Sequence, residues 1–368
     1  MTTDRVDLDA IAGRFEAFAR DEVHGNSPLY EALCLAIARA PWLLELATHC
    51  RAGQAQPNLL LAAIHHLVRR DPAAGLARYY ADVVKEPVAP DAALPEALSA
   101  FCAAHRDAII GLVATRLVQT NEPRRSAALL LALDAIRRRH GIERLALIEV
   151  GTSAGLNLLF ERYRFDLGYG RVVNPGGAPE IVCEVGGQDP AAIPAPPRIT
   201  SITGVDLNPI AADDPEEVDW LRSLVWPEQS ERWTLLADAL AVSATHPPRF
   251  ERGDAFEVLP RLVAELPADE PVCVFHSATL AHFDPADRLA FAELLRSLAT
   301  TRDLYWLSME NAHVTGLFEA PASAAITGGY FVLGLVHLSD PEAQPVALAA
   351  VNPHARWIEW WASEAPAE

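Results

Sequence analysis

The spacing of hydrophobic residues changes at Gly141, and this change constrains the fold more than any other feature of the chain. From residue 8 to about 140, apolar residues recur every three or four positions, as they do on the buried face of a helix. After Gly141, short apolar or β-branched runs alternate with helical stretches. That alternation is typical of a mostly parallel sheet with helices on both faces. We therefore predict an α/β protein with a helical domain over residues 1–140 and a sheet domain over residues 141–368.

The sheet domain is predicted to contain five strand-and-helix units and two final strands. The five strands are expected at residues 145–150, 199–206, 250–254, 271–276 and 304–309. The last two, at residues 330–338 and 346–351, have no helical stretch between them, so they should pair antiparallel at one edge of the sheet. Residues from about 169 to 197 interrupt the alternation with glycine and proline, and we interpret them as a β-hairpin insertion.

Charge and composition exclude several classes of protein. The net charge of -19 repels polyanions such as nucleic acids and anionic membranes. The basic runs Arg124–Arg125 and Arg137–Arg139 are short, and we interpret them as solvated helix faces or as partners of the helix C-terminal dipole, in preference to a phosphate site. No apolar run reaches the roughly 18 residues of a membrane span, and residues 1–15 do not resemble a secretory signal. The sequence predicts a cytoplasmic protein that acts on a small molecule, without a nucleic-acid or membrane partner, and it leaves the oligomeric state open.

A strand-to-helix turn with the features of a ligand site follows the first predicted strand. We assign five of its residues to a cofactor site: Glu149, Gly151, Ser153, Gly155 and Asn157. Glycines at such a turn let backbone N–H groups approach a ligand, and the N-terminus of the helix expected over residues 155–162 favours a negative charge. In methyltransferases the same turn holds the methionine part of S-adenosylmethionine. A tight turn with a structural role is the alternative.

Acidic residues at the ends of the next two strands extend this site. Asp206 ends the second strand, where a carboxylate can accept hydrogen bonds from both ribose hydroxyls. Asp254, followed by Ala255, ends the third strand, where methyltransferases commonly place an aspartate beside the adenine amine. Either acid could instead cap a helix. Because ligands of open α/β sheets bind outside the carboxyl ends of the strands, three successive polar turns predict a site for S-adenosylmethionine.

The fourth and fifth strands end in residues that could face the substrate. Phe275 is assigned to the cofactor site, and His276 beside it is a candidate general base. Glu310, after the fifth strand, is the second candidate catalytic residue. A histidine satisfied by a neighbouring backbone carbonyl is the alternative for His276. No three histidines have the spacing of a metal site, so no metal is expected.

The same turn also matches a different catalytic motif. Residues Gly151–Gly155 have the G-x-S-x-G pattern of the α/β-hydrolase nucleophile elbow, with Ser153 as the nucleophile. Asp254 and then His276 or His354 follow in the required order. That enzyme class has several strands before the elbow, whereas about 140 mostly helical residues precede it here. A serine hydrolase, and a non-catalytic protein that binds a nucleotide-like ligand, are the two alternatives.

A polar cluster interrupts the apolar helices just before the sheet domain. Its hydrogen-bonding side chains are those of Gln119, Asn121 and Glu122. We predict that these three residues line the substrate cleft. A turn in which the asparagine side chain caps the helix beginning near Arg124 is the alternative.

Several segments resemble the bacterial family catalogued as domain of unknown function 2332, along nearly the whole chain. They are Ser27–Tyr30, Gln119–Glu122, Gly155–Asn157, Gly204–Pro209, Val225–Gln229 and Asn352–His354, with Trp357 and Trp360. The resemblance implies a Rossmann-like S-adenosylmethionine-dependent methyltransferase architecture with an added helical domain, and it carries no established reaction. The glycines are sparser than in the usual methyltransferase turn, because Thr152, Ser153 and Ala154 occupy its middle.

Overall fold

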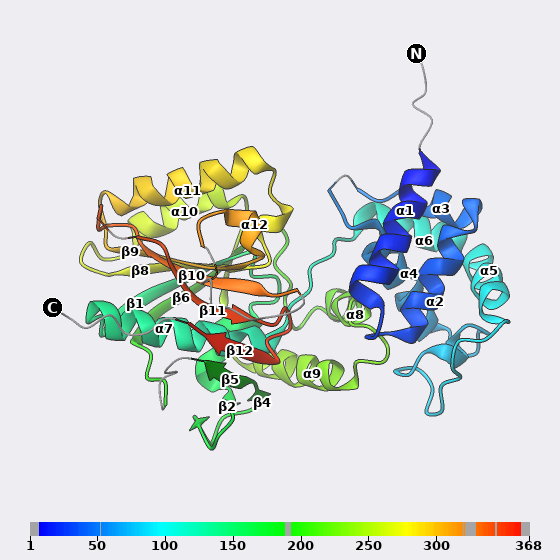
Figure 1. Ribbon diagram of the computed structural model, residues 1–368, viewed down its shortest axis with the longest axis horizontal. Helices are drawn as coiled ribbons and strands as arrows, with labels where there is room; N and C mark the ends of the chain where they lie inside the picture. Colours follow the sequence, from blue (N-terminus) through cyan, green and yellow to red (C-terminus); the bar gives the residue numbers. More distant parts are fainter. Residues whose placement is uncertain are drawn as a thin grey trace, which may run out of the picture. The chain divides into compact units, whose positions relative to one another are not determined.

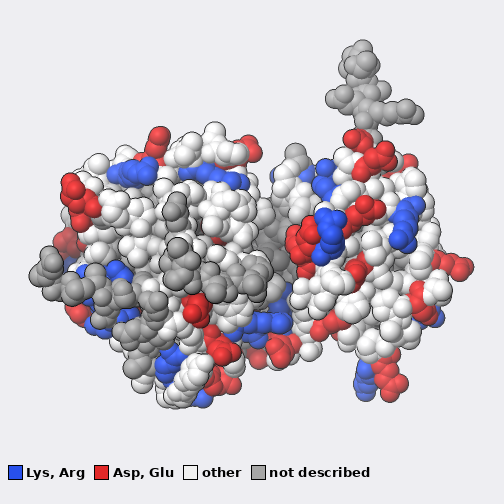
Figure 2. Space-filling model, in the orientation of Figure 1, with Lys and Arg blue, Asp and Glu red and all other residues white. Residues whose placement is uncertain are grey.

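Figure 1 shows the computed structural model, which describes residues 7–51, 53–187, 193–318, 320, 329–342 and 344–361. The chain divides into two compact units. The helical unit comprises Met1–Thr120 and Pro215–Thr234, and the sheet unit comprises Asn121–Asp214 and Leu235–Glu368. Helix α9 (Ser230–Thr245) begins in the first unit and ends in the second. On the face shown in Figure 2, Lys and Arg side chains are interspersed with Asp and Glu side chains.

The helical unit consists of short helices that bury leucine, alanine and aromatic side chains. Its described helices are α1 (Leu8–Phe18), η1 (Ala19–Val23), α2 (Pro28–Ala38), α3 (Pro41–Ala47), α4 (Gln56–Arg70), η2 (Ala77–Tyr79), α5 (Leu94–Ala104), α6 (Arg106–Thr115) and α8 (Pro215–Ser223). Helix α2 begins at a capping sequence, because Ser27 Oγ accepts the Tyr30 N–H at 3.1 Å and Pro28 is the first helical residue. Of the helices described, no single one is long and apolar enough to cross a membrane, although α5 and α6 pass that test together with an 80° bend between them.

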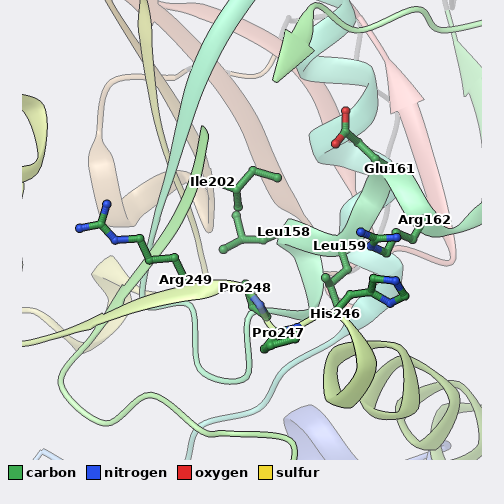
Figure 3. A pocket seen from close by; sticks show the side chains of 9 residues that line it. All are labelled: Leu158, Leu159, Glu161, Arg162, Ile202, His246, Pro247, Pro248 and Arg249. Atoms are coloured by element: carbon green, nitrogen blue, oxygen red, sulfur yellow. The ribbon is translucent and has the colours of Figure 1, made fainter. Parts of the chain in front are cut away.

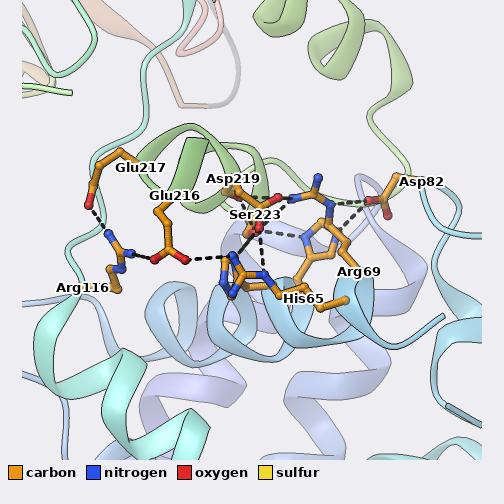
Figure 4. A network of polar contacts seen from close by, with 10 residues as sticks. His65, Arg69, Asp82, Arg116, Glu216, Glu217, Asp219 and Ser223 are labelled. Atoms are coloured by element: carbon orange, nitrogen blue, oxygen red, sulfur yellow. Dashed lines mark hydrogen bonds and ion pairs between the residues drawn. The ribbon is translucent and has the colours of Figure 1, made fainter. Parts of the chain in front are cut away.

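Ion pairs hold residues 215–234 in the helical unit, as Figure 4 shows. Arg69 Nη1 lies 2.8 Å from Asp219 Oδ1, and Arg69 Nε lies 3.7 Å from Asp82 Oδ2. His65 Nε2 lies 2.9 Å from the same Asp82 oxygen. Arg69 and Asp219 are separated by 150 positions in the chain. Sequence periodicity therefore gives no sign that this segment joins the earlier helices.

The division into units differs from the predicted boundary at residue 140 in two ways. Residues 215–234, which follow the second strand, belong to the helical unit. Helix α7 (Ser126–His140) belongs to the sheet unit, and its residues from Ser126 to Ile136 are buried. A helix that covers a sheet has the same hydrophobic spacing as a helix in a bundle. The spacing of hydrophobic residues therefore cannot show to which of the two units α7 belongs.

Within the described residues, nine strands form the main sheet in the order β5-β12-β11-β10-β9-β8-β1-β6-β7. Their bounds are β1 (Arg144–Val150), β5 (Glu184–Gly187), β6 (Arg198–Asp206), β7 (Arg249–Arg252), β8 (Val272–Ser277), β9 (Leu304–Glu310), β10 (Phe331–His337), β11 (Val346–Val351) and β12 (Trp357–Trp360). Strands β7, β6, β1, β8 and β9 are mutually parallel, and β10, β11 and β12 follow as antiparallel neighbours. The predicted α/β class with a mostly parallel sheet is therefore confirmed.

Two details of the sheet differ from the prediction. Strands β10 and β11 pair antiparallel as expected, but they are not at an edge, because β12 and β5 continue the sheet beyond them. The predicted hairpin insertion contributes β3 (Val172–Val173) and β4 (Glu180–Val182) to a separate small sheet in the order β3-β2-β4. Its central strand β2 (Arg164–Asp166) precedes the insertion and pairs antiparallel with β3 and parallel with β4. Residues 188–192 of that insertion lie outside the described residues.

Helices cover both faces of the main sheet (Figure 1). Helices α10 (Ala255–Glu265) and α11 (Pro285–Ala299) lie on one face, and α7 lies on the other. The core under α10 and α11 contains Val274, Phe291, Leu295 and Trp306, all of them buried. The short helices η3 (Pro123–Arg125), η4 (Leu156–Arg162), η5 (Leu280–His282) and α12 (Ala312–Thr315) complete the unit.

Candidate functional site

The carboxyl ends of β1, β6, β7 and β8 lie together at one edge of the sheet. Strand β1 lies between β6 and β8, with Val150 opposite Val205 on one side and opposite His276 on the other. The chain moves outward from β1 through β6 to β7 and then returns to β8 on the opposite side of β1. Ligands of open α/β sheets bind where the strand order reverses in this way. The predicted turn, Asp206 and His276 all lie at this edge.

Glu149 is a buried acid at the centre of the predicted turn. Its two carboxylate oxygens accept hydrogen bonds from Thr152 Oγ1 at 2.6 Å and from Asn157 Nδ2 at 2.9 Å. Burial raises its pKa from an ordinary 4.5 to about 7, although the two hydrogen bonds oppose the rise. Asn157 Oδ1 is also buried and has no hydrogen-bond partner among the described residues. A buried acceptor without a partner is costly, and it is ready to receive a donor from a ligand.

Asp206 connects the second strand to the turn. One carboxylate oxygen accepts the Ser153 N–H at 2.8 Å, and the other accepts the Asn208 N–H at 2.8 Å. The structure therefore brings Asp206 and the predicted turn into direct contact. Leu207, the next residue, is 69% exposed, and sequence reasoning missed it. Its one signal in the sequence is its position directly after the acid.

The two glycines of the turn make room for side chains of the chain itself. Gly151 has φ +73°, and a Cβ there would lie 2.3 Å from Thr279 Oγ1. Gly155 has φ +66°, and a Cβ there would lie 2.7 Å from Pro248 Cγ and 2.9 Å from Phe250 Cε1. Both positions therefore require glycine because of close contacts within the chain, and the expectation that their backbone approaches a ligand remains a prediction. The space beside each is filled by a threonine or by a proline and a phenylalanine.

The helix expected after the turn is a 3₁₀ helix, η4, instead of an α-helix. It spans seven residues and ends just before β2 begins at Arg164. A 3₁₀ helix rises more per residue than an α-helix, so it covers more distance in a short connection. At its start, the N–H of Leu156 is bonded to Asn121 Oδ1 at 3.1 Å.

The third predicted acid caps a helix. Asp254 is the N-cap of α10, and its Oδ1 accepts the Phe256 N–H at 2.9 Å. Its position remains close to Asp206, because the Gly253 N–H donates to the Asp206 carbonyl at 3.0 Å. Ala255 is buried at the start of α10, and Phe275 is fully buried within β8. Their assignment to the cofactor site remains a prediction.

His276 and Glu310 form a buried pair at the ends of β8 and β9. His276 Nδ1 lies 2.9 Å from Glu310 Oε1, and Trp306 Nε1–H donates to His276 Nε2 at 2.9 Å. Because an indole can only donate, Nε2 is the acceptor and Nδ1 carries the proton. The same Glu310 oxygen also accepts the N–H groups of Thr279 and Leu280. Burial opposes its ionisation, but the hydrogen bonds from His276 and the backbone outweigh burial and lower the pKa of Glu310.

This geometry changes the interpretation of His276. Both of its ring nitrogens are engaged, and the residue is fully buried. A general base needs a lone pair within reach of the substrate. In this structure His276 instead fixes Glu310, and its partners are a carboxylate and an indole rather than the backbone carbonyl considered as an alternative.

The polar cluster before the sheet contacts the turn through Asn121. Asn121 Oδ1 accepts the N–H of Leu156, at the start of η4. Glu122 caps η3 through the Arg124 N–H at 3.3 Å, and its Oε2 lies 3.5 Å from His354 Nδ1. Gln119 belongs to the helical unit. The assignment of these three residues to a substrate cleft remains a prediction.

Arg124 and Arg125 are buried, which corrects their interpretation as part of a solvated helix face. They are 8% and 7% exposed. Arg125 Nε donates to the Pro353 carbonyl at 2.9 Å and Nη1 donates to Ser277 Oγ at 3.3 Å, while its guanidinium lies 5.3 Å from the ring centre of Phe331. Adjacent arginines in a sequence usually indicate a surface, and the residues that Arg125 contacts lie far along the chain, in β8, in β10 and in the turn before β12.

The hydrolase triad is not assembled. Ser153 has the positive φ of +52° typical of a strained turn, but its backbone N–H is bonded to Asp206. Asp254 bonds the backbone of α10, and His276 bonds Glu310. His354 lies beside Glu122. In the ranges that the structure describes, no group of three His, Cys, Asp or Glu side chains is placed to hold a metal ion.

Comparison with known proteins shows the family of this chain. A sequence model of the family described as "Uncharacterized protein conserved in bacteria (DUF2332)" matches residues 12–360. No curated protein matches the chain.

Proposed function

The chain belongs to this bacterial family, and we propose that it binds S-adenosylmethionine at the carboxyl ends of β1, β6 and β7 and transfers the methyl group to a small-molecule acceptor. The observation that carries the proposal is the contact between Asp206 and the turn after β1, at the point where the strand order reverses. Five parallel strands followed by antiparallel ones is also the order expected of Rossmann-like methyltransferases.

The residues at this edge suit the ribose and adenine of the cofactor. An ionised carboxylate has about four acceptor sites, so Asp206 can accept ribose hydroxyls in addition to the N–H groups of Ser153 and Asn208. The exposed Leu207 offers an apolar surface for the adenine ring. Asp254 is placed near the adenine amine in this proposal.

The buried acceptors suit the methionine part of the cofactor. Asn157 Oδ1 has no partner among the described residues, and Glu149 lies directly beside Asn157. Together they can accept hydrogen bonds from an ammonium group. The cofactor supplies an electrophilic methyl group on its sulfonium. The chain supplies orientation of the acceptor, which can account for most of the acceleration of such a transfer, and His276 takes no part as a base.

A calorimetric titration with S-adenosylhomocysteine tests this proposal. We expect the wild-type chain to bind, and we expect Asp206→Asn to weaken binding at least tenfold, because each hydrogen bond to a charged group contributes about 1.5–3 kcal/mol. Asp213→Asn is the matched control, since Asp213 is an exposed acid a few residues away, and it should bind as the wild type does. Equal affinities of the two variants would contradict the proposal, as would no binding to folded wild-type protein at millimolar ligand.

A further inference from the structure

A cavity of about 480 Å³ lies in the sheet unit, apart from the strand-end site (Figure 3). Its lining residues are Leu158, Leu159, Glu161, Arg162, Ile202, His246, Pro247, Pro248 and Arg249. Ile202 lies four residues before Asp206 on β6, which corresponds to about 13 Å along the strand. Arg249 is the first residue of β7. The cavity is therefore located on the middle and the amino-end side of these strands.

The lining combines an apolar floor with polar side chains at its ends. Leu158, Leu159, Ile202 and the two prolines supply the apolar surface. In Figure 3, Arg162 and His246 lie together at one end, and Arg249 lies at the other. Arg249 is neutralised, because its Nη2 lies 2.7 Å from Glu251 Oε1 and 3.3 Å from Glu265 Oε2.

Arg162 is the cation that remains for a ligand. Its guanidinium makes no hydrogen bond or ion pair in the part of the chain that the structure describes. The neighbouring Glu161 interacts with it electrostatically, while burial raises the pKa of Glu161 and so disfavours its charged form. A guanidinium beside an apolar floor is complementary to a molecule with an anionic head and an apolar body.

We propose that this cavity binds a small amphipathic monoanion of the medium-chain carboxylate class, with the head group at Arg162 and His246 and the chain on the floor. The volume lies within the range of about 300–1,000 Å³ that small-molecule sites occupy. Binding here does not require methyl transfer, because none of the lining residues belongs to the strand-end site.

The cavity also contacts elements that support the turn. Pro248 packs against Gly155, and Leu158 and Leu159 are part of η4, which begins directly after Gly155. A molecule in the cavity would rest on these residues. Binding there is thus positioned to stabilise η4 together with the turn.

Titration with octanoate and with its neutral analogue octanamide tests this inference. We expect wild-type protein to bind octanoate, and we expect Arg162→Gln to weaken octanoate binding about tenfold while octanamide binding stays unchanged. Arg296→Gln is the matched control, because Arg296 is an exposed arginine on α11 of the same unit. A second variant, Ile202→Trp, fills the cavity and should weaken binding of both compounds.

Several outcomes would overturn the inference. They are no octanoate binding at millimolar concentration, equal octanoate affinity in Arg162→Gln and Arg296→Gln, and unchanged binding in a folded Ile202→Trp protein. If Ile202→Trp does not fold, the binding of octanoate and octanamide to Arg162→Gln is sufficient to test the inference. Each of these titrations is made without S-adenosyl compounds, so failure of the proposed methyl transfer does not affect them.

Discussion

Glu149 shows how a single residue can make stability depend on pH. Its carboxyl group is buried with hydrogen bonds from Thr152 and Asn157, and burial raises its pKa to about 7. An unfolded chain exposes the same group to water, where its pKa is about 4.5. The protonated form is therefore favoured in the folded state. A ligand that donates hydrogen bonds or positive charge to this region would favour the ionised form instead.

We predict that stability falls between about pH 4.5 and pH 7 because of Glu149. Below pH 4.5 both states are protonated and the folded state keeps its full stability, whereas above pH 7 the unfolded state has gained by ionising. The loss across this interval is about 3 kcal/mol. Glu149→Gln should remove this pH-dependent loss of stability, because the amide does not ionise and still offers an acceptor to Asn157. Urea unfolding of both proteins at pH 5 and pH 8 measures the difference, and identical pH dependence in the two would contradict this account.

At the residue scale, the sequence indicates which polar residues follow the strands, and it predicts burial poorly. Asp206 was identifiable because it ends a strand, and Asn157 because it follows the two-glycine turn; their side chains bond Ser153 and Glu149 in the structure. The burial of Arg125 could not be predicted, because its partners Ser277 and Pro353 lie more than 150 positions away in the chain. The hydrogen bond that occupies His276 Nε2 could not be predicted either, because its donor is Trp306 on a neighbouring strand.

At the scale of elements, Glu228 adds a second attachment of the segment 215–234 to the helical unit, besides the ion pairs of Asp219. Glu228 Oε2 accepts Ser27 Oγ–H at 2.7 Å, and Oε1 accepts the Leu29 N–H at 2.9 Å. It thereby joins the cap of α2, where the first N–H groups have no partner within the helix. The parallel strands of the main sheet were predictable because apolar runs in the sequence indicate them directly. The 3₁₀ form of η4 and the attachment of residues 215–234 were not, because both depend on contacts made across the fold.

We predict that Glu228→Ala destabilises the helical unit by about 1–3 kcal/mol, because it leaves the Leu29 N–H and the Ser27 hydroxyl without their acceptor. Hydrogen exchange should show faster exchange at the start of α2 and in residues 215–234. Glu96→Ala serves as the control, since Glu96 is an exposed acid on α5. Unchanged exchange in both segments would show that Glu228 does not anchor this part of the chain.

At the scale of the whole molecule, the order of parallel strands places the candidate site. The alternating pattern after Gly141 predicted the α/β class, and the reversal of strand order beside β1 follows from where β6 and β8 pair. Strands β12 and β5, which extend the sheet beyond β11, were not predicted. Their runs are short, and β5 pairs in parallel with a strand more than 170 positions later.

The most direct test of the central claim is a crystal structure grown with saturating S-adenosylhomocysteine. The account predicts ligand density at the carboxyl ends of β1 and β6, with the ribose hydroxyls on Asp206 and the methionine amino group near Glu149 and Asn157. Ligand density elsewhere in the sheet unit would contradict the account. It would also be contradicted if the protein binds the compound in solution but the crystal shows no ligand at the turn and at Asp206.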